Sequence, residues 1–175
     1  MLKIIHKRVL GSTQDYAHKL LASYTEDVLI IADIQTAGKS RHRERLWISN
    51  KGNFHGSFII DASKIGYTFF NINLINSHVI YAVQKTIAKF SGSNDIKVKL
   101  PNDVYYEGKK IAGILVETFY PLAIIGIGIN LISSPLGTST SLKDAFGIEI
   151  NNTDSKFINL IYNNILSKST GFPSI

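Results

Sequence analysis

The chain has 175 residues, of which 45% are hydrophobic, and its formal charge at neutral pH is +6. This size and composition fit one globular domain with its own core. The sequence contains no cysteine, which excludes disulfides, zinc–thiolate sites, iron–sulfur clusters and a cysteine nucleophile. The positive charge suits an anionic partner such as a nucleotide phosphate, a nucleic acid or an acidic protein surface, or it serves solubility alone.

Neither export nor membrane insertion is indicated by the sequence. Residues 1–8 lack the long apolar stretch and the cleavage site of a signal peptide. The longest apolar runs, such as 28–31, are far too short to span a bilayer. The five histidines are scattered and show no metal-binding spacing. We therefore expect a cytoplasmic protein without membrane contact.

A helix and a buried strand are the first clear elements. Ser12 is expected to cap the helix, and Asp15 completes a capping box. The apolar stripe that follows, at a spacing of three and four residues, consists of Ala17, Leu20, Leu21 and Tyr24. Residues 28–34 form a short apolar run that is typical of a buried strand.

Residues 38–52 are polar, basic and without periodicity, which predicts a loop, and a loop of this length in a compact domain is usually functional. The part up to residue 47 contains four cations, a glycine and the only tryptophan, namely Lys39, Arg41, Arg43, Arg45, Gly38 and Trp47. Guanidinium groups grip phosphates bidentately, so the loop suits stabilisation of a polyphosphate. A solvated basic loop or a non-specific nucleic-acid patch is the alternative.

The middle of the chain is predicted to consist mainly of strands. A strand at 57–60 precedes a helix that Asn73 caps and that ends at Ser91-Gly92. The apolar face of this helix consists of Val79, Val83, Ile87 and Phe90. The strands expected after it are 96–100, the hairpin 104–106 and 109–118 around Glu107-Gly108, and 123–131.

A last helix is expected at 155–168, before Gly171 and Pro173. Its predicted core face consists of Phe157, Leu160, Ile161 and Ile165. Because strands dominate the centre and helices cover them, we expect an α+β fold, with a mixed or antiparallel central sheet flanked by helices.

Two groups of residues in the second half suggest chemistry. Lys99 and Lys110 are predicted on neighbouring strands of one hairpin, with Asn102 and Asp103 between them. This set suits a cation, a carboxylate and a magnesium ligand around one anionic group, although an ordinary charged hairpin fits as well. Residues 126–130 place two glycines on one face of a strand, which admits a flat ligand or close packing.

Five segments, in this order and spacing, resemble the motifs of biotin–protein ligases. They are Ser12-Thr13-Gln14, 35–47, 99–103, 110–117 and 126–131. The family patterns are Ser-Thr-Asn, then Gln-Thr-x-Gly-Arg-Gly-Arg with a downstream tryptophan, Lys-Trp-Pro-Asn-Asp, Lys-x-x-Gly-Ile-Leu-x-Glu and Gly-x-Gly-x-Asn-Leu. Each motif alone is weak, but five in register are specific.

The resemblance implies a fold related to class II aminoacyl-tRNA synthetases and a two-step reaction. Biotin and ATP give biotinyl-5′-AMP and pyrophosphate, and a lysine of a biotin carboxyl carrier protein, from acetyl-CoA carboxylase or a related carboxylase, then takes the biotin. ATP with Mg²⁺ is implied as co-substrate, with no tightly bound prosthetic group. Both steps develop negative charge on phosphate, which a basic loop and a fixed lysine stabilise.

The resemblance also implies the site residues. The catalytic residues would be Lys110, Arg41 and Asp103, and Asp103 would bind Mg²⁺ transiently. Biotin and the adenylate would be bound by Ser12, Thr13, Gln14, Gln35, Gly38, Lys39, Ser40, Arg41, Trp47, Lys99, Asn102, Lys110, Gly113, Gly128 and Asn130.

The chain departs from the family pattern at several of these positions. Lys39 and Ser40 replace Arg and Gly, Gln14 replaces Asn, and Leu100 replaces Trp. Lysine lacks the guanidinium fork and serine is stiffer than glycine. These changes affect affinity more than reaction type, and a looser loop would release adenylate into solution.

The expected domain organisation is one catalytic domain over residues 1–175. By comparison with the family, we expect no N-terminal winged helix and therefore no binding to specific DNA. We also expect the small C-terminal β-barrel domain of many relatives to be absent. An exposed strand at 123–130 would let two copies pair as a homodimer. The alternatives are a lipoate–protein ligase of the same superfamily, a basic nucleic-acid-binding module and an inactive homologue. The lack of cysteine excludes an octanoyl transferase.

Overall fold

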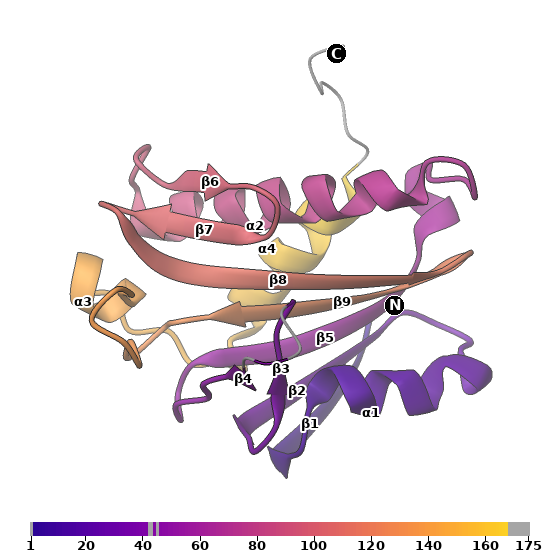
Figure 1. Ribbon diagram of the computed structural model, residues 1–175, viewed down its shortest axis with the longest axis horizontal. Coiled ribbons are helices and arrows are strands. Elements are labelled where there is room, and N and C mark those ends of the chain that lie inside the picture. Colours follow the sequence, from indigo (N-terminus) through magenta and orange to yellow (C-terminus); the bar gives the residue numbers. More distant parts are fainter. Residues whose placement is uncertain (1, 42–43, 45, 168–175) are drawn as a thin grey trace.

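A seven-stranded sheet with the strand order β1-β2-β5-β9-β8-β7-β6 forms the centre of the molecule (Figure 1). The computed structural model describes residues 2–41, 44 and 46–167. The strands are β1 (Lys3–Leu10), β2 (Val28–Gln35), β5 (Phe54–Asp61), β6 (Lys97–Lys99), β7 (Asp103–Tyr106), β8 (Lys109–Phe119) and β9 (Leu122–Ile129). β1 and β2 pair in parallel, whereas the other neighbours are antiparallel.

Helices cover both faces of this sheet (Figure 1). The helix α1 (Thr13–Leu20) lies on one face, and α2 (Ile75–Ser91) and α4 (Ser155–Leu166) lie on the other. The larger core packs between the sheet and α2 and α4, and a smaller one packs under α1. The short α3 (Leu142–Phe146) follows β9. The predicted α+β fold with a mixed, helix-flanked sheet is confirmed.

The strand β2 shows why its sequence is apolar throughout. Its alternate residues enter different cores, since Leu29 and Ile31 face α2 and α4 whereas Val28 and Ile30 face α1. A strand that is covered on both faces has no polar side, so the predicted buried strand over 28–34 is confirmed.

The helix α1 begins as the sequence predicts. The Ser12 hydroxyl accepts the backbone N–H of Asp15 at 3.3 Å, which satisfies a free donor of the first turn. The α-helix ends at Leu20, and the remaining members of the apolar stripe continue in the 3-10 helix η1 (Leu21–Ser23) and at Tyr24. They pack on the smaller core together with Ala17.

The basic segment 38–52 is more regular than the predicted loop. It contains the two-stranded ribbon of β3 (Gly38–Lys39) and β4 (Leu46–Trp47), in which Gly38 pairs with Trp47. Arg43 and Arg45 lie outside the described residues. The ribbon brings the tryptophan back over the start of the segment, a pairing that a sequence without periodicity does not reveal.

The starts and ends of the two long helices differ in part from the prediction. The 3-10 helix η3 (Ile72–Leu74) leads directly into α2, so Asn73 is not the cap. Gly92 ends α2 in the left-handed conformation, as predicted. In α4, Ile158 is buried instead of Leu160. Lys168, Gly171 and Pro173 lie outside the described residues.

The predicted hairpin of β7 and β8 is present. Glu107 and Gly108 both have positive φ, 47° and 74°, as a two-residue type I′ turn requires. The strand before it is shorter than predicted, because β6 ends at Lys99 and Leu100 is 59% exposed. The strand β9 lies between β5 and β8, so the prediction that 123–130 is an exposed edge is wrong.

The described part of the chain contains no helix that is long and apolar enough to cross a membrane.

Near the start of β2, a buried carboxylate ties distant elements together. Asp27 accepts hydrogen bonds from the hydroxyls of Tyr24, at 2.5 Å, and of Tyr162, at 2.6 Å, and lies 3.4 Å from the ammonium of Lys64. Burial opposes its ionisation, but these three partners outweigh burial and hold the pKa of Asp27 below its usual value.

We predict that Tyr162→Phe lowers the free energy of unfolding by about 1–2 kcal/mol at pH 7, because a buried carboxylate loses a donor. Since the pKa of Asp27 is lowered by folding, this contribution is present above the unfolded value of about 4 and disappears as the pH falls through the folded value. Urea denaturation at pH 7 and at pH 2, with Tyr16→Phe as control, measures the effect. An equal loss at both pH values would contradict this explanation.

Candidate active site

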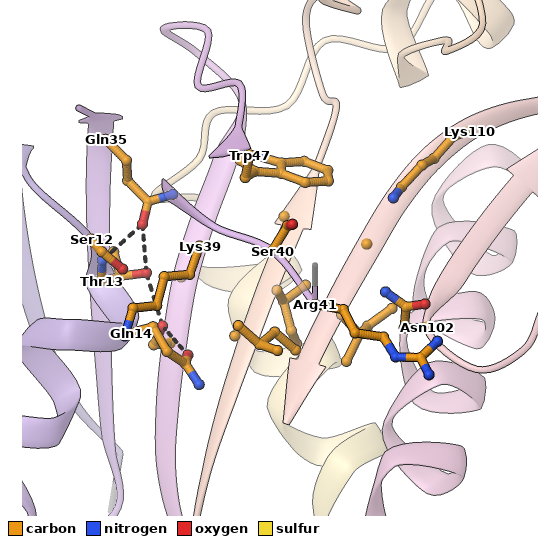
Figure 2. A pocket seen from close by; sticks show the side chains of 18 residues that line it. Ser12, Thr13, Gln14, Gln35, Lys39, Ser40, Arg41, Trp47, Asn102 and Lys110 are labelled. Atoms are coloured by element: carbon orange, nitrogen blue, oxygen red, sulfur yellow. Dashed lines mark hydrogen bonds between the residues drawn. The ribbon is translucent and has the colours of Figure 1, made fainter. Parts of the chain in front are cut away.

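A cavity lies on the face of the sheet that α1 covers, where separated motifs of the chain meet (Figure 2). Most of the residues predicted for the site line it: Ser12, Thr13, Gln14, Gln35, Lys39, Ser40, Arg41, Trp47, Asn102, Lys110, Gly113 and Gly128. They come from the start of α1, the end of β2, the β3–β4 ribbon, the connection between β6 and β7, and the central strands β8 and β9.

The floor of the cavity is made of glycines on β8 and β9. Gly113 and Gly128 are direct partners in the ladder. A Cβ atom on Gly128 would lie 2.5 Å from the indole of Trp47, and one on Gly113 would lie 2.8 Å from the same ring. A side chain at either position would therefore displace Trp47. The bare face that two spaced glycines predict is present, and the Trp47 ring lies over it (Figure 2).

One end of the cavity is a chain of polar side chains (Figure 2). The carbonyl of Gln35 accepts the backbone N–H and the hydroxyl of Thr13, at 2.8 and 3.0 Å. The hydroxyl of Ser57, which is fully buried, lies 2.8 Å from the hydroxyl oxygen of Thr13 and 3.0 Å from the carbonyl oxygen of Gln14, and its single proton can be donated to either. These bonds fix the side chains in place before any ligand enters.

A buried histidine supports this polar end from behind. The backbone N–H of Gln35 donates to the hydroxyl of Ser49 at 2.9 Å, and that hydroxyl lies 3.0 Å from Nδ1 of His55. Burial lowers the pKa of His55 to about 4, so its ring is neutral at neutral pH. His55, one of the five histidines without metal-binding spacing, is thus a structural residue.

The opposite end of the cavity is cationic because of a bulge in β8. Asp103 pairs with Gly113 and Val104 with Ala112, but Tyr105 pairs with Lys110, so Ile111 is an extra residue. In a regular strand, Lys110 and Gly113 would face opposite sides. The extra residue shifts the alternation by one, and the Lys110 ammonium lies 3.2 Å from where a Gly113 Cβ would be.

Lys110 is held between a carboxylate and an aromatic ring. Its ammonium lies 2.6 Å from Oδ1 of Asp103 and 5.4 Å from the ring centre of Trp47. The segment after β9 also holds its backbone, since the N–H donates to Thr138 and the carbonyl accepts from Thr140. The lysine is therefore oriented by its neighbours while its side chain borders the cavity.

The β3–β4 ribbon supplies the second cation. Arg41 lines the cavity and extends toward Asn102, on the same side as Lys110 (Figure 2). Lys39 forms an ion pair with Asp15 in the first turn of α1, so it ties the ribbon to the helix. Arg41 and Lys110, which the resemblance implies as catalytic residues, thus line the same cavity.

Four of the predicted site residues do not line the cavity. Asp103 is connected to the cavity through its ion pair with Lys110. Gly38 packs against two lining residues, since a Cβ there would lie 2.7 Å from the backbone oxygen of Trp47 and 3.1 Å from Nε2 of Gln35. Lys99 lies over the ring of Tyr105, 5.2 Å from its centre. β7 separates it from the strand of Lys110, so the predicted neighbourhood of the two lysines is wrong.

Asn130 is also directed away from the cavity. Its side chain is 2% exposed and donates to the carbonyl of Thr140 at 3.1 Å. Its backbone joins β8 through Ile111 and the start of α3 through Leu142. In this conformation Asn130 organises the segment behind Lys110, whereas the sequence motif predicts a residue near the phosphates.

Among residues 2–41, 44 and 46–167, no three metal-binding side chains lie close enough together to hold an ion. The oxygens of Asp103 and Asn102 are of the type that Mg²⁺ prefers, and Asn102 lines the cavity. Asp103 is paired with Lys110 in this conformation. The residues present would therefore assist an ion that is already bound to a phosphate, rather than hold a bare one.

Sequence reasoning missed several lining residues, namely Gly56, Ser57, Ile114, Leu115 and Ile127, whereas Gly126 belongs to the predicted bare strand face. Gly56 and Ser57 lie on a strand that is buried along seven of its eight residues, so nothing marks them as functional. The only available signal was a glycine and a serine inside an apolar strand, since glycine there indicates a close approach of other atoms.

The fold and the cavity together define an α+β domain whose cavity has a polar end and a cationic end. Comparison with known proteins specifies the family. The model of the biotin/lipoate A/B protein ligase family matches residues 7–130. The bifunctional ligase/repressor BirA of Bacillus subtilis is 34% identical over 147 residues, which cover 81% of this chain and 44% of the relative. The chain therefore belongs to the biotin/lipoate A/B protein ligase family.

Solved structures show the same fold. The biotin protein ligase of Leishmania major in complex with biotinyl-5-AMP has a TM-score of 0.81 at 22% identity, and the match covers 94% of this chain and 73% of that one. The Aquifex aeolicus ligase in complex with biotin and ATP has a TM-score of 0.78 at 24% identity, covering 93% and 68%. The family and fold that the sequence motifs predict are confirmed, and the chain spans less than half of the Bacillus relative.

We predict that Gly128→Ala displaces Trp47 from the cavity floor, because the new methyl group would lie 2.5 Å from the indole. Trp47 is the only tryptophan, so its fluorescence reports this movement directly. We expect a changed emission maximum and a loss of about 1–3 kcal/mol of stability from overpacking.

Gly137→Ala is the matched control, since a Cβ there has no neighbour within 4 Å. An unchanged emission spectrum in folded Gly128→Ala would show that the ring does not occupy the glycine floor in solution.

Proposed function

We propose that this chain activates biotin with ATP and transfers it to a lysine of a biotin carboxyl carrier domain. The observation that carries this proposal is the polarity of one cavity. Hydrogen-bonding groups of Gln35, Thr13 and Gln14 line one end, Lys110 and Arg41 line the other, and glycines lie between. Biotin has the same arrangement, with a polar ring, an apolar middle and a terminal carboxylate.

The polar end favours a cyclic urea over the dithiolane ring of lipoate. Gln35 turns its carbonyl to the backbone N–H of Thr13, which leaves its amide nitrogen as a donor on the side away from Thr13 (Figure 2). A urea oxygen accepts such a bond, whereas sulfur accepts hydrogen bonds only weakly. The structural relatives with biotin or its adenylate support the same choice.

The cationic end suits formation of an adenylate. A biotin carboxylate oxygen would attack the α-phosphorus of ATP, the bond to the β-phosphate oxygen would break, and pyrophosphate would leave. Lys110 would contact both the carboxylate and the α-phosphate, and Arg41 would bind the phosphates, because charge that develops there needs fixed cations. Mg²⁺ would arrive with ATP, with Asp103 and Asn102 supplying oxygen contacts.

The second step would transfer the acyl group to the carrier. The deprotonated amine of a carrier lysine would attack the biotinyl carbonyl, AMP would leave with the bonding electrons, and the amine would release a proton. No covalent bond to the enzyme is needed, which agrees with the absence of cysteine. The proposed partner is the carrier domain of a carboxylase, and the proposed compartment is the cytoplasm. ATP with Mg²⁺ would act as an exchangeable co-substrate, without a tightly bound prosthetic group.

The nucleic-acid alternative has less support from the geometry. Of the three described cations in the basic segment, Lys39 is paired with Asp15, Arg41 borders the cavity and only Lys51 lies apart from both. A phosphate-backbone surface instead needs several free cations that face solvent together. The ribbon therefore suits an enclosed small anion better than an extended polyanion.

We predict that the chain catalyses biotin-dependent exchange between ATP and pyrophosphate and that Lys110→Ala reduces it by about a hundredfold or more, because a fixed charge at the reacting phosphate is lost. Exchange of labelled pyrophosphate, with lipoate in place of biotin as substrate control, measures the reaction. Lys143→Ala is the matched variant, since Lys143 pairs with Glu149 outside the cavity.

Exchange that lipoate supports and biotin does not would refute the choice of substrate. If neither acid supports exchange, and DNA binds with a steep dependence on salt, the proposed ligase function is wrong and a nucleic-acid-binding module is the better explanation.

A further inference from the structure

Outside the cavity lining, a carboxylate on β8 connects to the polar end. Oε2 of Glu117 accepts a hydrogen bond from the side-chain amide of Gln14 at 2.6 Å. Nε2 of His18, one helical turn along α1, lies 3.0 Å from the same oxygen. The rings of Phe119 and His18 pack in a T-shaped arrangement, with centres 5.1 Å apart. Glu117 is thus held in place while it contacts Gln14.

The chemistry of these groups fixes the direction of the Gln14 amide. An ionised carboxylate only accepts hydrogen bonds, so Gln14 must turn its nitrogen toward Glu117 and its oxygen toward Ser57. The hydroxyl of Ser57 lies 3.0 Å from that oxygen and can donate to it. A glutamine between two uncharged partners could bind either way round, and Glu117 removes this freedom.

The Gln14 oxygen lies on the floor of the cavity. It would be 2.6 Å from a Cβ atom on Gly126, and both Gln14 and Gly126 line the cavity. Because a carbonyl oxygen has two lone pairs, a bond from Ser57 leaves one acceptor position. The polar end therefore offers an acceptor on Gln14 as well as a donor on Gln35, which are the complements of a urea N–H and a urea C=O.

We propose that Glu117 is a positioning residue, which keeps the Gln14 carbonyl turned into the cavity to accept an N–H of the biotin urea. This inference rests on the proposed function. Removing the charge of Glu117 lets the Gln14 amide turn over, which would present an N–H₂ donor to the ligand N–H and lose one hydrogen bond.

Glu117→Gln, which keeps the shape of the side chain, tests this role. We expect the Kd for biotin to rise about tenfold, which corresponds to one lost hydrogen bond, and the KM for ATP to stay unchanged. Dethiobiotin, which keeps the urea but lacks the sulfur, should lose affinity by the same factor. Glu149→Gln, in an ion pair outside the cavity, is the matched control.

A double-mutant cycle separates positioning from a general structural role. Gln14→Leu should itself weaken biotin about tenfold, and Glu117→Gln should then cost nothing more, because Glu117 acts through Gln14. Should Glu117→Gln fail to fold, Gln14→Leu decides alone: wild-type affinity for biotin in that variant overturns the proposal.

Calorimetric titration of the wild-type chain with biotin is the first arm. If it binds no biotin, with or without ATP, the proposed function fails and this inference fails with it. If the wild-type chain binds biotin, the inference alone is overturned when Glu117→Gln binds equally well, weakens ATP as much as biotin, or costs the same with Leu at position 14.

Discussion

The extra residue in β8 is the constraint on which the site depends. Without Ile111 as a bulge, Lys110 would alternate to the α2 side of the sheet, into the apolar core, while Gly113 faced the cavity. With the bulge, the ammonium and the bare glycine lie on one face, next to each other. The spacing Lys-x-x-Gly, which would place the two residues on opposite faces of a regular strand, is explained by this single irregularity.

The remaining parts of the site are arranged around that face. The glycine floor leaves room for Trp47, whose ring also contacts Lys110, and the β3–β4 ribbon that carries Trp47 is tied to α1 by Lys39 and Asp15. The lysine that replaces the family's arginine thus has a partner in this conformation, and whether the loop releases adenylate stays a prediction. The polar end is built separately, from side chains that bond to one another.

Local sequence patterns predicted the features that depend on local physics. The shared face of the glycines follows from strand alternation. The turn at Glu107-Gly108 follows from the tolerance of glycine for positive φ, and the end of α2 follows from Gly92. Lys99 was misplaced because β6 and β8 lie on either side of β7. Glu117 could not be recognised, since its contact with Gln14 joins residues 103 positions apart. The motifs identified the family, whereas only the fold showed which residues of these motifs lie next to one another.

The central claim is that the cavity around the bulged Lys110 joins a vitamin carboxylate to a nucleotide phosphate. The most direct test is mass spectrometry of the small molecules that remain bound to the chain after incubation with biotin and MgATP, without any carrier protein. The account predicts biotinyl-5′-AMP on the protein and one pyrophosphate released for each adenylate. Recovery of unreacted biotin and ATP, from a folded chain that binds both, would contradict it.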